Sequence, residues 1–278
     1  MKKFIIRTVT GALFVAALVG SIVYGQASFG ALFTVITLLT VNEFCTIVEN
    51  YKGTTFSKWL AVLGGCYLFI ASFLSLHMNY ANPLPLFAPY MAIVAYAFIR
   101  QLFNREGKPL DNFAYFTLSQ IYAALPFALL NLLSTGCAEY GETYSFVLPL
   151  SIFIFIWCND TGAFCVGCTI GRHKMFERIS PKKTWEGFAG GAVVAIAAGY
   201  VMSLFFPEMN AWEWIGMAAV TVAAGTLGDL VESCIKREMQ LKDSGSMLPG
   251  HGGFLDRFDS TLLAVPCVIV YLIFIGIL

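Results

Sequence analysis

The sequence predicts an all-α, polytopic integral membrane protein with about nine transmembrane helices. Hydrophobic residues make up 58% of the 278 positions, charged residues only 12%, and the mean hydropathy is +0.73. Soluble globular domains carry about 25% charged residues, so an ordinary soluble fold is excluded. The spacing of the apolar stretches and the distribution of the basic residues also support a membrane fold.

The apolar stretches have the length that a membrane-spanning helix needs. About 20 consecutive apolar residues cross the roughly 30 Å of hydrocarbon in a bilayer. Polar connections separate the stretches, most of them short and the two longest near 171–185 and 233–257. The predicted spans cover 8–25, 28–48, 57–76, 84–103, 113–133, 145–168, 186–206, 211–232 and 258–278.

The basic residues determine the orientation that the sequence predicts. When the N-terminus is placed in the cytoplasm, all 17 Lys and Arg residues fall on the cytoplasmic side of these spans. Cytoplasmic connections of membrane proteins are enriched in these residues. We therefore expect a cytoplasmic N-terminus and a C-terminus on the opposite side. Residues 1–27 also fit a secretory signal with a weak cleavage site at Ala27, whose removal would leave this topology unchanged.

Chemistry is concentrated in the second half of the chain. Residues 1–140 are expected to form about five transmembrane helices with few polar side chains. Residues 141–278 are expected to form a catalytic transmembrane region with cytoplasmic loops at 171–185 and 233–257. Glu43, inside the second span, is an exception, because an ionisable side chain is costly there without a partner or a polar cavity. The sequence leaves open whether Glu43 lines a site or joins two helices.

A polar run, Asn159-Asp160-Thr161-Gly162, interrupts the sixth span. A carboxylate in the middle of a span requires a partner or polar surroundings. Asp160 therefore either bonds to a neighbouring helix or lines a cavity that opens to the cytoplasm. We predict the second role.

A basic motif, SPKKTWEG, precedes the seventh span. Helix N-termini present unpaired amides and the positive end of the helix dipole, which favours an anion. Lys182 and Lys183, with the hydroxyls of Ser180 and Thr184, are therefore candidates for binding a phosphate. The alternative is a basic patch that contacts anionic lipid.

The longest polar run lies between the eighth and ninth spans, from Ser233 to Asp259, and follows Asp229. Asp256 and Asp259 are three residues apart, which places both carboxylates on one face of a helix. Carboxylates are ligands that magnesium prefers, and Lys and Arg side chains bind phosphate. The candidate residues of this site are Asp229, Lys236, Arg237, Lys242, Asp243, Gly252, Gly253, Asp256, Arg257 and Asp259.

This run resembles the signature of the phosphatidate cytidylyltransferase family. The SPKKTWEG motif and Asp160-Thr161-Gly162 are also similar to that family, so the resemblance covers roughly the C-terminal 120 residues. The residues of the run that carry it are Ser233, Ile235, Lys236, Arg237, Lys242, Asp243, Gly245, Leu248, Pro249, His251, Gly252, Gly253, Phe254, Asp256, Arg257 and Asp259.

The resemblance implies an enzyme of phospholipid biosynthesis that makes CDP-diacylglycerol and pyrophosphate from CTP and phosphatidate. It implies magnesium as the cofactor, with a potassium ion nearby, and assigns the metal to Asp229, Asp256 and Asp259. It further implies a homodimer. We expect the protein to lie in a bacterial inner membrane with its active site facing the cytoplasm, and to have no nucleic-acid partner.

In the implied reaction, a phosphate oxygen of phosphatidate attacks the α-phosphorus of CTP and pyrophosphate leaves in line. Neutralising charge is the main task. A phosphomonoester has a second pKa of about 6, so no strong general base is required. His251 is thus predicted to be a positioning donor. The predicted catalytic residues are Asp229, Lys236, Arg237, His251, Asp256 and Asp259, and the predicted substrate-binding residues are Asp160, Ser180, Lys182, Lys183, Thr184, Lys242, Asp243, Gly252, Gly253 and Arg257.

Two other functions fit parts of the sequence. A CTP-dependent transferase that acts on another membrane lipid phosphate would need the same motifs. An ion-coupled transporter would use Asp160 and Glu43 as intramembrane ion sites. Transport requires access from both faces, and the two dense polar motifs have no polar counterpart on the outer side, which disfavours a transporter.

Overall fold

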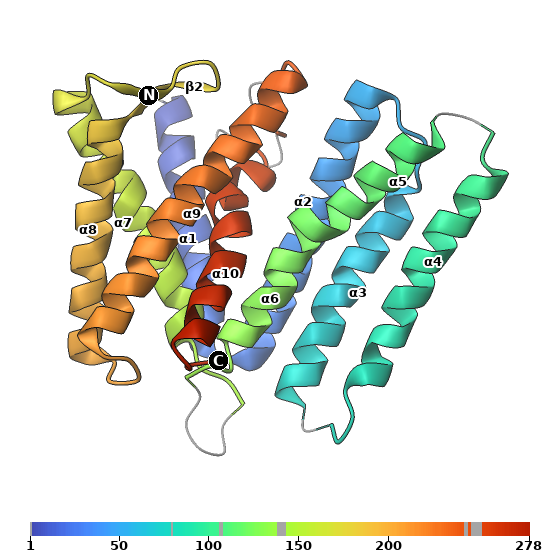
Figure 1. Cartoon of the computed structure of the whole chain (residues 1–278), viewed down its shortest axis with the longest axis horizontal. Coiled ribbons are helices and arrows are strands. Elements are labelled where there is room, and N and C mark those ends of the chain that lie inside the picture. Colours follow the sequence, from blue (N-terminus) through green and yellow to red (C-terminus); the bar gives the residue numbers. More distant parts are fainter. Residues whose placement is uncertain (1, 79, 106–107, 138–142, 242–243, 246–251) are drawn as a thin grey trace.

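The computed structural model describes residues 2–78, 80–105, 108–137, 143–241, 244–245 and 252–278, with the helical backbone alone for residues 2–7. Helices dominate this part of the chain (Figure 1). In chain order the elements are α1 (Lys2–Tyr24), α2 (Gln26–Lys52), α3 (Lys58–His77), η1 (Leu84–Phe87), α4 (Ala88–Phe103), α5 (Pro109–Leu118), η2 (Ser119–Ala124), α6 (Leu125–Leu133), α7 (Val147–Ile170), β1 (Lys174–Phe176), β2 (Ser180–Thr184), α8 (Trp185–Phe205), α9 (Ala211–Glu238) and α10 (Leu255–Phe274).

Every predicted span coincides with a helical segment in the described residues, which confirms the fold class. Eight segments are long and apolar enough to cross a membrane, with α5, η2 and α6 forming one of them. The remaining span is α1, whose part from Thr8 to Tyr24 is a shorter apolar helix. The chain is therefore an integral membrane protein.

The helices stand side by side with their ends at two opposite levels (Figure 1). The N-terminal end of the chain and the strand β2 lie at one level, and the C-terminus lies at the other. At one edge, α4 leaves Leu102 78% and Phe103 80% exposed. Large apolar side chains facing outward are expected of a helix in contact with lipid.

Aromatic side chains join the first and second halves of the chain. Phe258 at the start of α10 packs edge-on against Phe14 of α1, Phe127 of α6 and Phe153 of α7, at ring-centroid distances of 5.7, 5.3 and 6.3 Å. Phe33 of α2 contacts Phe127 and Phe153 as well. Edge-to-face pairs are a preferred arrangement for aromatic rings. This cluster holds the N-terminal turn of α10 in the middle of the helices.

Both predicted cytoplasmic loops contain more regular structure than the sequence suggested. Within 171–185, β1 and β2 form an antiparallel hairpin that pairs Lys174 with Thr184. Within 233–257, α9 continues to Glu238 and α10 already begins at Leu255. Lys236 pairs with Glu232 one turn earlier on α9, and such i,i+4 pairs support a helix. Of the connection that remains, residues 242–243 and 246–251 lie outside the described residues.

Small residues bring α7 and α8 into close contact. The buried face of α8 repeats every fourth residue as Gly187, Gly191, Ala195 and Gly199. A Cβ atom on Gly191 would lie 2.6 Å from the carbonyl oxygen of Asn159, and one on Gly162 would lie 2.9 Å from the Cα of Gly191. Small residues at such interfaces let helix backbones approach within a membrane. The contact places the polar run of α7 beside the N-terminus of α8.

We expect Gly191→Val to destabilise the protein by about 1–3 kcal/mol, the usual cost of adding bulk to a packed interior. The added side chain would overlap the backbone of Asn159 and push α8 away from α7. The thermal unfolding midpoint of the detergent-solubilised variant measures this effect. Gly20→Val is the matched control, because a Cβ atom there meets nothing within 4 Å. Equal midpoints for the two variants would contradict the packing argument.

Candidate active site

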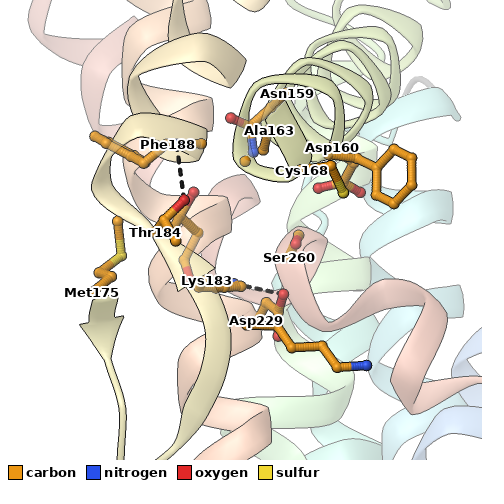
Figure 2. Close-up of a pocket in the computed structure, with 15 residues that line it drawn as sticks. Asn159, Asp160, Ala163, Cys168, Met175, Lys183, Thr184, Phe188, Asp229 and Ser260 are labelled. Atoms are coloured by element: carbon orange, nitrogen blue, oxygen red, sulfur yellow. Dashed lines mark hydrogen bonds and ion pairs between the residues drawn. The ribbon is translucent and has the colours of Figure 1, made fainter. Parts of the chain in front are cut away.

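The hairpin borders a cavity of about 320 Å³, called here the hairpin cavity (Figure 2). Its walls come from α7, the hairpin, and the first turn of α8, and the C-terminal part of α9 and Ser260 of α10 complete them. The uncharged polar and charged residues of its lining include Asn159, Asp160, Lys182, Lys183, Thr184, Thr226, Asp229 and Ser260.

A second cavity, of about 330 Å³, lies between α1 and the start of α10 and is called the α1 cavity. One part of its wall is largely apolar, with Phe14, Val15, Ile156 and Trp157. Another part is charged, with Asp160, Asp229, Asp256, Arg257 and Asp259. The α1 cavity thus joins an apolar surface to a polar one.

The two cavities meet at three residues. Asp160, Asp229 and Ser260 line both of them. These residues come from three different helices, α7, α9 and α10. α9 and α10 pack closely at this point. A Cβ atom on Gly228 would lie only 2.6 Å from the carbonyl oxygen of Asp259, so glycine permits the close approach. Molecules held in the two cavities would therefore meet beside carboxylates.

Lys183 of β2 points to this junction and pairs with Asp229, at 2.6 Å between Nζ and Oδ2 (Figure 2). Thr184, the next residue, is the N-cap of α8 and accepts a hydrogen bond from the amide of Gly187. A hydroxyl that caps a helix fixes the direction in which the chain enters it. The cap therefore fixes the backbone that carries Lys182 and Lys183 into the hairpin cavity.

The hairpin is tied to its neighbours by two charged side chains. The carboxylate of Glu186 accepts hydrogen bonds from the backbone amides of Arg172 and His173 and from Nδ1 of His173. Arg237 of α9 donates through Nε to the carbonyl of Ile179 at 3.3 Å. These bonds hold both ends of the hairpin beside the cavity.

Asp256 has a different environment from Asp229 and Asp259. Its Oδ1 accepts from Lys236 at 2.7 Å, and its Oδ2 accepts from the backbone amides of Ser244 and Gly253, each at 2.9 Å. Lys236 also pairs with Glu232, which is fully buried. Asp256 therefore borders the α1 cavity and accepts more hydrogen bonds from the described groups of the protein than Asp229 or Asp259 does.

The structure brings many of the predicted residues together around the two cavities: Asp160, Lys182, Lys183, Thr184, Asp229, Asp256, Arg257 and Asp259. Within the described part of the chain, Ser180, Lys236, Arg237, Gly252 and Gly253 line neither of the two cavities. Lys242, Asp243 and His251 lie outside the described residues.

Gly252 has a local reason to be glycine. Its φ angle of +80° is one that other residues rarely adopt, and a Cβ atom would lie 2.5 Å from Oδ2 of Asp256. Its part in the site is thus to let the backbone pass close to Asp256.

The sequence analysis missed three groups of residues in or near the site: four residues of α1, Glu232 and Tyr122. The four residues of α1 that line the α1 cavity are Thr10, Gly11, Phe14 and Val15, in a stretch that the sequence presents only as an apolar span. Glu232 could have been found, because it lies four residues before Lys236 on the same helix. Tyr122 has a buried hydroxyl without a hydrogen-bond partner among the described groups, and Glu232, Asp229 and Asp259 are its charged neighbours.

The carboxylates at the junction suit magnesium in their chemistry. No group of three or more His, Cys, Asp or Glu side chains that could hold a metal occurs in the described residues. Magnesium is usually bound by one or two carboxylates together with water and substrate phosphates. Asp229 and Asp259, which both line the α1 cavity, fit that pattern. Asp256 fits it less well, because its oxygens already accept three hydrogen bonds. Among the groups that the structure describes, Asp229 has two partners, the side chains of Lys183 and Ser233, and Asp259 has one, the amide of Ser260.

Comparison with known proteins finds bacterial relatives named phosphatidate cytidylyltransferase. Over 141 residues the chain is 46% identical to a phosphatidate cytidylyltransferase of Staphylococcus epidermidis, covering 50% of this chain and 54% of the relative. Over 157 residues it is 40% identical to the phosphatidate cytidylyltransferase of Bacillus subtilis, covering 56% of each chain. The chain spans about half the length of the curated relatives that it matches.

A family-wide comparison covers much more of the chain. The sequence model of the cytidylyltransferase family matches residues 5–275 of this chain. This match includes α1 and the rest of the N-terminal half as well as the motifs around the two cavities. The chain therefore belongs to the cytidylyltransferase family.

Proposed function

We propose that the protein is a phosphatidate cytidylyltransferase, which converts CTP and phosphatidate to CDP-diacylglycerol and pyrophosphate. The observation that carries this proposal is the meeting of two chemically different cavities at Asp160, Asp229 and Ser260. A reaction between a water-soluble nucleotide and a membrane lipid requires such a meeting point. The names of the relatives support the same activity.

The hairpin cavity suits the phosphates of CTP. Lys182 and Lys183 provide positive charge beside the N-terminus of α8, where the helix dipole also favours an anion. In this proposal Lys183 exchanges part of its interaction with Asp229 for a phosphate oxygen. Ser180 and Arg237 support the hairpin that carries these lysines.

The α1 cavity suits phosphatidate. Its apolar wall offers contacts to acyl chains, and Arg257 offers charge to the phosphate. Phosphatidate placed there would direct its phosphate toward the junction with the hairpin cavity. The α-phosphate of CTP would approach from the other side.

The reaction then needs one substitution at phosphorus. A phosphatidate oxygen forms a bond to the α-phosphorus of CTP, and the bond to the β-phosphate oxygen breaks, so that pyrophosphate leaves with the electron pair. The lysines and Arg257 neutralise charge that develops on these oxygens. Magnesium would supply further charge neutralisation, with Asp229 and Asp259 as the residues that would hold it.

The proposed orientation places the hairpin and the N-terminus in the cytoplasm, in a bacterial inner membrane. Their common level in the structure and the one-sided distribution of Lys and Arg support it (Figure 1). The catalytic role of residues 141–278 remains a prediction from the sequence, and a potassium ion and a homodimer remain implications of the family resemblance.

The orientation predicts the behaviour of reporters fused after Leu278. Because the C-terminus lies at the opposite level from the hairpin, we expect a periplasmically active phosphatase to be active there and a fluorescent protein that matures only in the cytoplasm to be dark. Fusions that replace the chain after Tyr51, at the end of α2 beside Lys52, serve as the control and should give the reverse pattern. A fluorescent fusion after Leu278 would overturn the orientation.

The test of the function is an assay of the purified protein with labelled CTP, phosphatidate and magnesium. Transfer of label into lipid, with equal release of pyrophosphate, is the expected result. Label transfer only with a different lipid phosphate would replace the acceptor while keeping the reaction type. Folded protein without transfer to any lipid phosphate would overturn the proposal.

A further inference from the structure

Glu43 of α2 reaches the start of α10, more than 200 residues later in the chain. Its carboxylate accepts hydrogen bonds from the backbone amides of Phe254 at 2.9 Å and Leu255 at 3.3 Å, and from the hydroxyl of Ser244. The side chain is buried, at 6% exposed. A buried carboxylate is thus satisfied by groups of the polar connection between α9 and α10.

The contact supplies an N-terminal cap, which α10 does not obtain from its own N-cap residue. The first amides of a helix have no partner within the helix, and a side chain at the N-cap usually accepts from them. The N-cap residue of α10 is Phe254, which has no acceptor in its side chain. The carboxylate of Glu43 takes that place, and its negative charge faces the positive end of the helix dipole.

Two glycines of the connection adapt to Glu43. A Cβ atom on Gly253 would collide with Oε1 of Glu43, and one on Gly245 would lie 2.9 Å from Oε2. A Cβ atom at either position would require the Glu43 carboxylate or the backbone beside it to shift. Glycine at both positions therefore lets the backbone close around Glu43.

The same connection holds Asp256. Ser244 donates its amide to Oδ2 of Asp256, and its hydroxyl accepts from the Asp256 amide at 3.3 Å while donating to Glu43. Asp256 in turn pairs with Lys236. Arg257 and Asp259, which line the α1 cavity, lie in the turn of α10 that begins here. A shift of this turn would move every charged residue that α10 contributes to the cavity.

We infer that Glu43 is a positioning residue of the active site, which fixes the first turn of α10 from the N-terminal half of the chain. The inference rests on the proposed function for the reaction that is measured. It answers the question that the sequence left open: Glu43 lines neither of the two cavities in the described structure, and it joins α2 to the turn that lines one of them.

The kinetic test compares Glu43→Gln with Glu49→Gln, an exposed glutamate on the same helix. We expect Glu43→Gln to lower kcat by roughly 10²-fold, the scale of a misplacement of about 1 Å in an active site. The KM for CTP should stay close to that of the unchanged protein, because Glu43 makes no contact with the hairpin in the described structure. Full kcat in Glu43→Gln would overturn the inference, as would an equal loss in Glu49→Gln.

A pair of variants tests the contact itself. Gly253→Ala should lower kcat strongly in the unchanged protein, since its methyl group displaces Glu43. In a Glu43→Ala background that methyl group has room, so Gly253→Ala should add little further loss. Residues in contact show such non-additive effects, and distant ones do not. Additive losses would contradict the contact.

Hydrogen exchange gives a readout that does not depend on activity. In Glu43→Gln, faster exchange confined to the amides of Phe254 and Leu255 and their neighbours is expected, with the helices otherwise unchanged. Unchanged exchange there, or faster exchange throughout the protein, would overturn the inference. A lack of transferase activity in the unchanged protein would refute the proposed function instead, and the exchange experiment would still test the contact.

Discussion

We expect Asp229→Asn to lower kcat for cytidylyl transfer by about 10³-fold, the upper end of what one electrostatic group contributes in an active site. Asp229 lies where the two cavities meet and is one of two carboxylates proposed to hold magnesium there. The substitution keeps the shape of the side chain and removes its charge. Labelled lipid formed per unit time, at a series of magnesium concentrations, measures the effect.

The magnesium dependence of the rate distinguishes a role of Asp229 in binding the metal from a purely electrostatic role of its charge. Loss of a ligand should raise the magnesium concentration needed for half-maximal rate, in addition to lowering the maximum. Asp111→Asn, near the start of α5 and in neither of the two cavities among the described residues, is the matched control and should behave like the unchanged protein. A normal rate and normal magnesium dependence in Asp229→Asn would remove Asp229 from the site.

The second large effect is expected for Asp256→Asn, through a different physical cause. Its carboxylate accepts from Lys236 and from two backbone amides. The asparagine side chain has one acceptor oxygen and a donor group, so it leaves at least one of these partners unpaired. A buried unpaired polar group costs about 1–3 kcal/mol. We therefore expect a lower unfolding midpoint as well as a loss of turnover of about 10²-fold or more.

Asp256→Asn and Asp229→Asn should differ in their dependence on magnesium. If Asp256 acts by holding Lys236 and the connection before α10, its loss should leave the magnesium concentration for half-maximal rate close to normal. A strong increase would instead return Asp256 to the metal site that the family resemblance implies. Normal turnover in Asp256→Asn would exclude both roles.

Much of the architecture follows from local properties of the sequence. Hydropathy predicted each of the spans, because a helix in lipid must be apolar over its own length. The motifs at 180–187 and 233–259 were also visible, since polar residues beside apolar spans stand out. Local patterns were less reliable at the loops, because the hairpin is held by a contact that is not local, the bond from Arg237 to Ile179.

Contacts between distant residues were decided only by the tertiary structure. Asp256 and Asp259 looked equivalent in the sequence, three residues apart on one helix. The structure gives Asp256 partners from α9 and from the connection before α10, and this distinguishes the two carboxylates. The spacing of two residues on a helix predicts that they share a face and does not predict what faces them.

The sequence by itself determined that this chain is a helical membrane protein and which polar segments carry its chemistry, because burial in lipid and local charge density act over short stretches. The tertiary structure decided that α1 forms a cavity wall and that Glu43 caps α10. Neither could be read from the residues concerned. An apolar helix has the same pattern whether it faces lipid or a substrate, and a buried carboxylate needs a partner that packing alone selects.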